Sequence, residues 1–120
     1  MNPVSWFEIP VTDFGRAKSF YESVLGINLD ENDVGGSKMG WFPWDHEAPG
    51  SAGAIIKHEA YTPSHAGTMV YLSVEDIETT LQRIETNGGK VLMEKQSIGE
   101  FGFVAHFEDS EGNRVALHST

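Results

Sequence analysis

The sequence predicts an α+β fold made of two βαβββ modules. The pattern of one strand, one helix and three further strands occurs twice, and the two copies align at a constant offset of 63 residues. Self-similarity at one fixed offset is the signature of a repeated structural unit. The offset matches these pairs: Val11 with Val74, Asp13 with Asp76, Phe14 with Ile77, and Gly26 with Gly89. We therefore expect one domain over residues 1–120, with module one over 1–60 and module two over 67–120.

The first module begins with a strand, because apolar and other residues alternate along SWFEIPV over residues 5–11. Asp13 is then placed to cap the N-terminus of a helix, and Gly26 to end it in the left-handed conformation. The apolar stripe of that helix is Phe14, Ala17, Tyr21, Val24 and Leu25. The three following strands are expected in GINLDEND, SKMGWFPW and SAGAIIKH. In this part of the first module we expect an aromatic cluster formed by Trp41, Phe42 and Trp44. The cluster could pack in the core, stack on a planar ligand or cover a dimer contact.

The second module repeats the pattern, with Val70, Leu72 and Val74 in its first strand. A helix with apolar positions Ile77, Leu81 and Ile84 follows and ends at residues 87–89. The last strands are expected in KVLMEKQ, EFGFVAHFED and NRVALHS. Neither module alone protects both faces of its sheet, so we expect the two to pair into a curved mixed sheet with the helices outside. Pairing within one chain and pairing between chains both remain open.

The net charge, the length of the apolar stretches and the cysteine content indicate which binding partners are expected. A formal net charge of −10 disfavours nucleic acid and anionic membrane surfaces, and the apolar stretches are too short to span a bilayer. The absence of cysteine excludes disulfides and thiolate metal sites and suits a reducing compartment. We therefore expect a cytoplasmic protein that needs no nucleic acid or membrane. The acidity is typical of a solvated surface and would also favour a cationic ligand.

The alternation of the strands predicts which side chains line the surface opposite the helices. If Phe7, Ile9 and Val11 pack under the helix, Trp6 and Glu8 point to the other, concave face. The same argument assigns a set of second-module residues to that face: Met69, Tyr71, Ser73, His106, Arg114, Ala116 and His118. The concave face is therefore the predicted ligand surface.

Three stretches, FEIPVTDFGRAKSFYESVLG, VYLSVEDIETTLQRIETNGGKV and FEDSEGNRVALHS, resemble the vicinal-oxygen-chelate superfamily of glyoxalases, bleomycin resistance proteins and extradiol dioxygenases. The resemblance covers both modules and is greatest for a glyoxalase-related subgroup. It implies the paired-module fold, a small-molecule ligand and a homodimer. It also implies metal-ligand positions at Trp6, Met69, Ala116 and one residue of SAGAIIK.

Those positions do not suit the divalent ion of the family's metal enzymes. Such an ion takes imidazole or carboxylate ligands, whereas indole and alanine offer no suitable lone pair and a thioether is too soft. The segment SAGAIIK contains no His, Asp, Glu or Gln. We therefore predict no cofactor and no metal at the usual site. An atypical divalent metal held by Glu8, His106 and His118 stays an open alternative.

The candidate catalytic residues are Glu8 and His118. Burial beside Trp6 would raise the pKa of Glu8 toward that of a general base, but Glu8 could equally be satisfied by Arg114 or a backbone amide. Each histidine could equally be structural. The expected ligand-binding residues are Trp6, Met69, Tyr71, His106, Arg114 and Ala116. The resemblance implies either a glyoxalase-like enzyme or a non-catalytic sequestering protein for a cationic aromatic ligand, similar to bleomycin resistance proteins. A partner domain without a working pocket is a third alternative.

Overall fold

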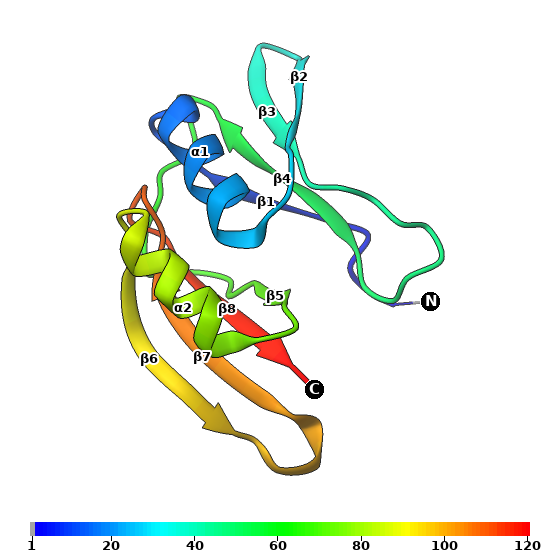
Figure 1. The fold of residues 1–120 in the computed structure, drawn as a ribbon. Coiled ribbons are helices and arrows are strands. Elements are labelled where there is room, and N and C mark those ends of the chain that lie inside the picture. Colours follow the sequence, from blue (N-terminus) through cyan, green and yellow to red (C-terminus); the bar gives the residue numbers. More distant parts are fainter. Residues whose placement is uncertain (1) are drawn as a thin grey trace.

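The computed structural model describes residues 2–120 and folds them as two four-stranded sheets, each covered on one face by a helix (Figure 1). The first module contains β1 (Trp6–Pro10), α1 (Phe14–Leu25), β2 (Asp30–Val34), β3 (Ser37–Trp41) and β4 (Ala52–Lys57). Its strand order is β1-β4-β3-β2, in which β1 is parallel to β4 and the other neighbours are antiparallel.

The second module contains β5 (Tyr71–Ser73), α2 (Ile77–Thr86), β6 (Lys90–Ser97), a short 3-10 turn (Gly99–Phe101), β7 (Phe103–Glu108) and β8 (Arg114–Ser119). Its strand order, β5-β8-β7-β6, repeats that of the first sheet, with β5 parallel to β8. The α+β fold of two βαβββ modules is therefore confirmed. The sheet itself is divided into two, because β1 and β5 are both edge strands and a groove separates β1 from residues 62–70.

The sequence correctly predicted where both helices begin, in each case from one aspartate at the N-cap. Asp13 accepts a hydrogen bond from the Arg16 amide at 3.0 Å, and Asp76 accepts one from the Thr79 amide at 3.2 Å. Gly26 ends α1 in the left-handed conformation with φ 65°. In the second module Gly88, with φ 92°, takes that conformation instead of the aligned glycine one residue later. Within residues 2–120, neither helix is long and apolar enough to cross a membrane.

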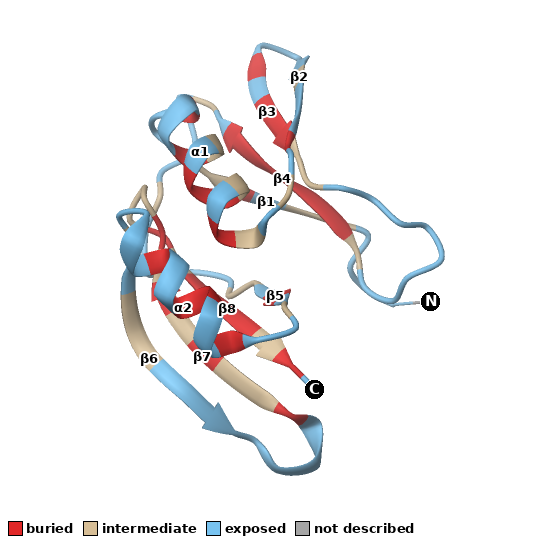
Figure 2. Cartoon of the chain, viewed as in Figure 1, coloured by how far each residue is buried: buried red, intermediate tan, exposed pale blue. Residues whose placement is uncertain are grey.

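One hydrophobic core joins the two modules. The buried cluster includes Ile9 of β1 and Phe20 of α1, as well as Ile84 of α2 and Phe107 of β7 (Figure 2). The Phe20 and Phe107 rings lie 6.2 Å apart between centroids, and α1 contacts α2 directly. The modules therefore pair within this chain, which answers the question that the sequence left open.

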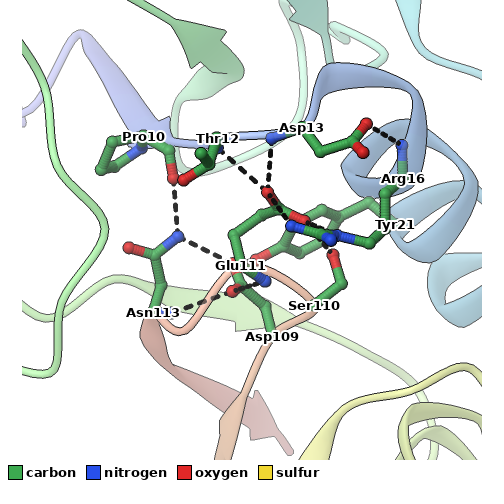
Figure 3. Close-up of polar contacts among 9 residues, drawn as sticks. All are labelled: Pro10, Thr12, Asp13, Arg16, Tyr21, Asp109, Ser110, Glu111 and Asn113. Carbon is green, nitrogen blue, oxygen red and sulfur yellow. Dashed lines mark hydrogen bonds and ion pairs between the residues drawn. The ribbon is translucent and has the colours of Figure 1, made fainter. Parts of the chain in front are cut away.

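A turn of the second module, residues 109–113, also binds the first module through polar contacts (Figure 3). The buried Asp109 carboxylate accepts a hydrogen bond from the Tyr21 hydroxyl at 2.6 Å, and the Asn113 amide group donates to the Pro10 carbonyl at 2.7 Å. Burial, and then the nearby Asp109 charge, raise the pKa of Tyr21 well above its usual value. Tyr21 therefore acts as a neutral donor that ties α1 to this turn.

Glu111 lies at the centre of the same joint. Its carboxylate accepts hydrogen bonds from the backbone amides of Thr12 and Asp13 at 3.0 and 2.7 Å, and from Arg16 Nε at 2.7 Å. Burial of the carboxylate opposes its ionisation, but the bonds from Arg16, from those amides and from the Ser110 hydroxyl lower its pKa to about 2. The ionised carboxylate therefore stabilises the folded pair of modules.

We expect Glu111 to make stability depend on pH. Its folded pKa of about 2 lies below the ordinary value of 4.5, so its contribution is complete above the ordinary pKa and is lost as the pH falls toward the folded one. Because the Arg16 side chain is 56% exposed, solvent screening weakens its interaction with Glu111. We therefore expect ionised Glu111 to contribute about 2 kcal/mol to the free energy of unfolding at neutral pH. Urea denaturation of the wild type and Glu111→Gln measures it as a stability difference that shrinks in acid.

The control for this experiment is Glu85→Gln, which changes an exposed glutamate on α2. Its stability difference from the wild type should be within about 0.5 kcal/mol and should not vary between neutral and acid solution. A Glu111→Gln difference that stayed constant with pH would show that ionised Glu111 does not stabilise the joint.

Candidate functional site

Each sheet has one face that points away from the helices, which we call its outer face. On the first sheet this face carries Trp6 and Trp41, whose rings meet edge to face with centroids 5.6 Å apart. They lie over an apolar floor made of Met39, Ala54 and Ile56. Trp41 Nε1 is buried and has no hydrogen-bond partner within residues 2–120. The outer face of the first sheet is therefore an aromatic surface over an apolar floor.

Glu8 shares this outer face, as the alternation of β1 predicted. Its Oε2 accepts a hydrogen bond from Trp6 Nε1 at 3.3 Å. The side chain is exposed in the single chain, so the burial on which its expected general-base role depended is not present there. Its partner is Trp6 and not Arg114, the partner that the structural alternative offered. Glu8 is thus an exposed carboxylate bonded to the indole of Trp6 and accessible to a ligand.

Trp41, Phe42 and Trp44 do not form the single cluster that the sequence suggested. Phe42 packs on the helix side against Phe7 and Tyr21, at 5.7 and 5.8 Å between ring centroids. Trp44 is 60% exposed and stacks on His46 in the loop after β3. Consecutive residues of an extended chain point in opposite directions, which separates Trp41 from Phe42. Only Trp41 joins the candidate site.

The outer face of the second sheet is polar. Arg114 donates from Nε and Nη2 to His106 Nδ1 at 3.1 and 2.8 Å, and the Tyr71 ring meets His106 edge to face at 6.0 Å. His118 Nε2 donates to the Phe101 carbonyl at 2.7 Å. These residues share one face because Ala105, Phe107, Val115 and Leu117 pack into the core on the other. Met69 lies just before β5 and is half-buried.

The family's metal-ligand positions do not fit a divalent ion. Trp6 lies on the aromatic surface, and Ala116 is completely buried between its neighbours. The residues of β4 that face outward are Ala54 and Ile56, so the fourth position has no donor in this register. In residues 2–120, no group of three His, Asp or Glu side chains is arranged to hold a metal, and Glu8, His106 and His118 do not form the atypical site. The donor chemistry therefore disagrees with a resident metal.

Two features of this region were missed from the sequence. His65 Nε2 lies 2.7 Å from Glu108 Oε1, although the residues are 43 positions apart and no spacing indicates the contact. A groove of about 240 Å³ runs between β1 and residues 62–70. Its lining includes Glu8 from the first module and Arg114 from the second, with hydroxyl groups from Thr62, Ser64 and Thr68. The groove thus brings one predicted residue of each module to a common space.

The comparisons with known proteins agree with this geometry. Residues 4–117 match the model of the glyoxalase/bleomycin resistance protein/dioxygenase superfamily. The chain belongs to this superfamily. The resemblance that the sequence showed is therefore confirmed over nearly the whole chain.

Three similar proteins illustrate the match. A glyoxylase-like domain-containing protein of Didymella fabae is 32% identical over 121 residues, which cover 95% of this chain and 91% of that protein. The anthracycline biosynthesis protein DnrV of Streptomyces peucetius is 25% identical; the match covers 94% of this chain but only 45% of DnrV. A solved superfamily domain from Frankia sp. EAN1pec has a TM-score of 0.74 at 16% identity, covering 99% of this chain and 98% of that domain. The last likeness shows the fold alone.

Proposed function

We propose that this superfamily member binds a small organic molecule on its outer faces without a resident metal ion. The observation that carries the proposal is the pair of Trp6 and Trp41 beside the accessible carboxylate of Glu8. The apolar floor under the rings and the Glu8 carboxylate together give the mixture of apolar and polar groups that ligand sites have. Donor chemistry at the usual metal positions supports a metal-free mode of binding.

A planar aromatic cation is the ligand class that this surface fits best. An indole face attracts a cation, and the Glu8 carboxylate beside it adds a direct charge interaction. The net charge of −10 would steer a cation toward the chain. The likeness to a protein named for anthracycline biosynthesis also supports a polycyclic aromatic ligand. On this proposal the chain acts as a sequestering protein.

A glyoxalase-like enzyme is the second candidate, with Glu8 as general base and His118 as its partner in proton transfer. Glu8 is accessible, as a base must be to reach the proton that it removes, but it lacks the burial on which this role was expected to depend. His118 uses Nε2 to donate to the Phe101 carbonyl, so only Nδ1 remains for chemistry. We place catalysis second for that reason.

We also propose that two copies of the chain form a homodimer through these faces. Tyr71 is 51% exposed and Phe101 is 69% exposed, so a second copy would cover apolar surface on both. Sedimentation of the purified protein should then give twice the chain mass of 13.2 kDa.

Titration with the planar cation aminoacridine tests the proposed binding. We expect quenching of tryptophan fluorescence with a dissociation constant of about 10–100 µM at low salt. Binding should weaken as salt is added, because exposed charges are screened. Glu8→Gln should weaken binding by about tenfold, which corresponds to the loss of one charge interaction beside Trp6.

Two controls make this titration specific. Glu85→Gln removes one negative charge from α2, away from the outer face, and should bind aminoacridine as the wild type does. Trp44→Phe removes the exposed indole of the loop and should leave the quenching in place. The proposal is wrong if aminoacridine does not bind, or if Trp44→Phe abolishes the signal while Glu8→Gln leaves it unchanged.

A further inference from the structure

The Arg114 side chain, at the start of β8, has no carboxylate partner within the described residues. Both hydrogen bonds of its side chain go to His106 Nδ1, at 3.1 and 2.8 Å. A nitrogen that accepts two N–H bonds carries no proton, so His106 is neutral with its proton on Nε2. Within residues 2–120, no Asp or Glu oxygen lies within 4.0 Å of Arg114. The guanidinium is therefore oriented by its neighbour but its charge is not neutralised.

The acidic residue best placed to neutralise Arg114 is engaged elsewhere. Glu108 stands directly opposite Arg114 in the β7–β8 ladder, which would allow an ion pair across the strands. Its Oε1 instead lies 2.7 Å from His65 Nε2. In a chain with 18 acidic and 8 basic residues, a half-buried arginine without an acidic partner is unusual. The carboxylate opposite Arg114 is therefore committed to His65 and forms no ion pair with the guanidinium.

The surroundings of Arg114 suit a small oxyanion. It lines the groove of about 240 Å³ between the modules, together with the hydroxyl residues Thr62, Ser64 and Thr68. A guanidinium has five N–H donors and binds carboxylates through paired bonds, and two of these donors are used by His106. The Ser64 hydroxyl is already used, because it donates to the Ala66 carbonyl at 3.0 Å, which leaves Thr62 and Thr68 as the hydroxyl residues of the lining for a ligand. The groove is smaller than the pockets of drug-sized ligands, which start at about 300 Å³.

Glu8 limits the charge of the anion that this groove accepts. The Glu8 carboxylate lines the same groove, so it repels any anion there, and a doubly charged one more strongly. We propose that the groove between the modules binds the carboxylate group of a small monoanion through Arg114. This inference goes beyond the proposed function, because the lining of the groove includes neither Trp6 nor Trp41.

Benzoate is the probe for this site, and two-dimensional NMR is the measurement. We expect benzoate to shift the Arg114 Nε–Hε signal and the backbone amide signals of residues 113–115, with a dissociation constant of about 1 mM or tighter. Arg114→Gln should weaken binding at least about tenfold. The matched control is Arg83→Gln, which removes an exposed arginine on α2 and should bind benzoate as the wild type does.

A second variant keeps the test decisive if Arg114→Gln folds poorly. His106→Glu places a carboxylate against Arg114 and retains the arginine, so it should abolish benzoate binding by occupying the guanidinium. Unchanged benzoate affinity in this variant would overturn the inference, as would shifts confined to residues away from the groove. Inorganic phosphate binding more tightly than benzoate would overturn the assignment to a monocarboxylate.

The outcomes separate this inference from the proposed function. Aminoacridine binding is detected by the fluorescence of the tryptophans in the first module, and benzoate binding by the NMR signals around Arg114. Aminoacridine binding without benzoate binding would overturn the carboxylate site alone. Benzoate binding without aminoacridine binding would overturn the aromatic-cation proposal and retain the Arg114 site.

Discussion

Replacing Asp109 by alanine should destabilise the protein by about 3–5 kcal/mol, because several buried donors lose their acceptor together. The carboxylate is 2% exposed and accepts the Tyr21 hydroxyl at 2.6 Å. It also accepts the amide of Glu111 at 2.8 Å and both the amide and the side chain of Asn113 at 2.9 Å. The loss therefore affects the turn and its contact with α1 at once.

Thermal unfolding and urea denaturation measure this loss. The midpoint of thermal unfolding should fall by about 12–20 °C, which follows from the entropy of unfolding for a chain of this length. Tyr21→Phe removes only one of the four donors and should cost about 2 kcal/mol, because the acceptor is a charged carboxylate. The matched control is Asp45→Ala, because Asp45 also accepts a backbone amide but lies in an exposed loop. A loss for Asp109→Ala as small as that of Asp45→Ala would refute the polar joint between the modules.

Replacing Gly102 by alanine should destabilise the protein by about 3–5 kcal/mol through backbone strain and overlap. Gly102 has φ 105° and ψ −136°, a conformation that residues with a Cβ rarely adopt. A Cβ built there would overlap the backbone carbonyl oxygen of Ser119, which belongs to β8 and cannot move without breaking the ladder. The substitution should also disturb the hairpin that presents the Phe101 carbonyl to His118.

The matched variant is Gly99→Ala in the same turn. Gly99 also has a positive φ, 74°, but a Cβ there would meet open space. We expect this variant to cost only about 1 kcal/mol, the usual penalty of the left-handed conformation. Urea denaturation compares the two, and the ring-nitrogen NMR signals of His118 should change in Gly102→Ala. Equal losses in both variants would mean that the Ser119 oxygen does not constrain this turn.

The features that the sequence predicted correctly depend on local periodicity. Alternation along β1 assigned Trp6 and Glu8 to one face and Ile9 to the core, because neighbouring residues of a strand point in opposite directions. A single aspartate before each apolar stripe placed both helix starts, because the N-cap bond is made within three residues.

The features that escaped prediction depend on contacts between distant residues. Glu111 accepts a hydrogen bond from the Thr12 amide, 99 positions away in the sequence. The sequence therefore showed the turn around Glu111 as a motif that resembles the family, but it did not show that this turn joins the two modules. The His65–Glu108 contact likewise has no local signal. The exposure of Glu8 depends on how the sheets are arranged, and no strand pattern reports that the sheet is divided.

The metal content of the protein tests the central claim of a metal-free ligand site most directly. Protein purified without chelators would be measured by elemental mass spectrometry, with nickel, zinc, iron and manganese quantified per chain. Because Trp6, Ala116 and the outward residues of β4 supply no suitable donor, the account predicts well below one ion per chain. One equivalent of any of these metals, lost together with aminoacridine binding on chelation, would contradict it.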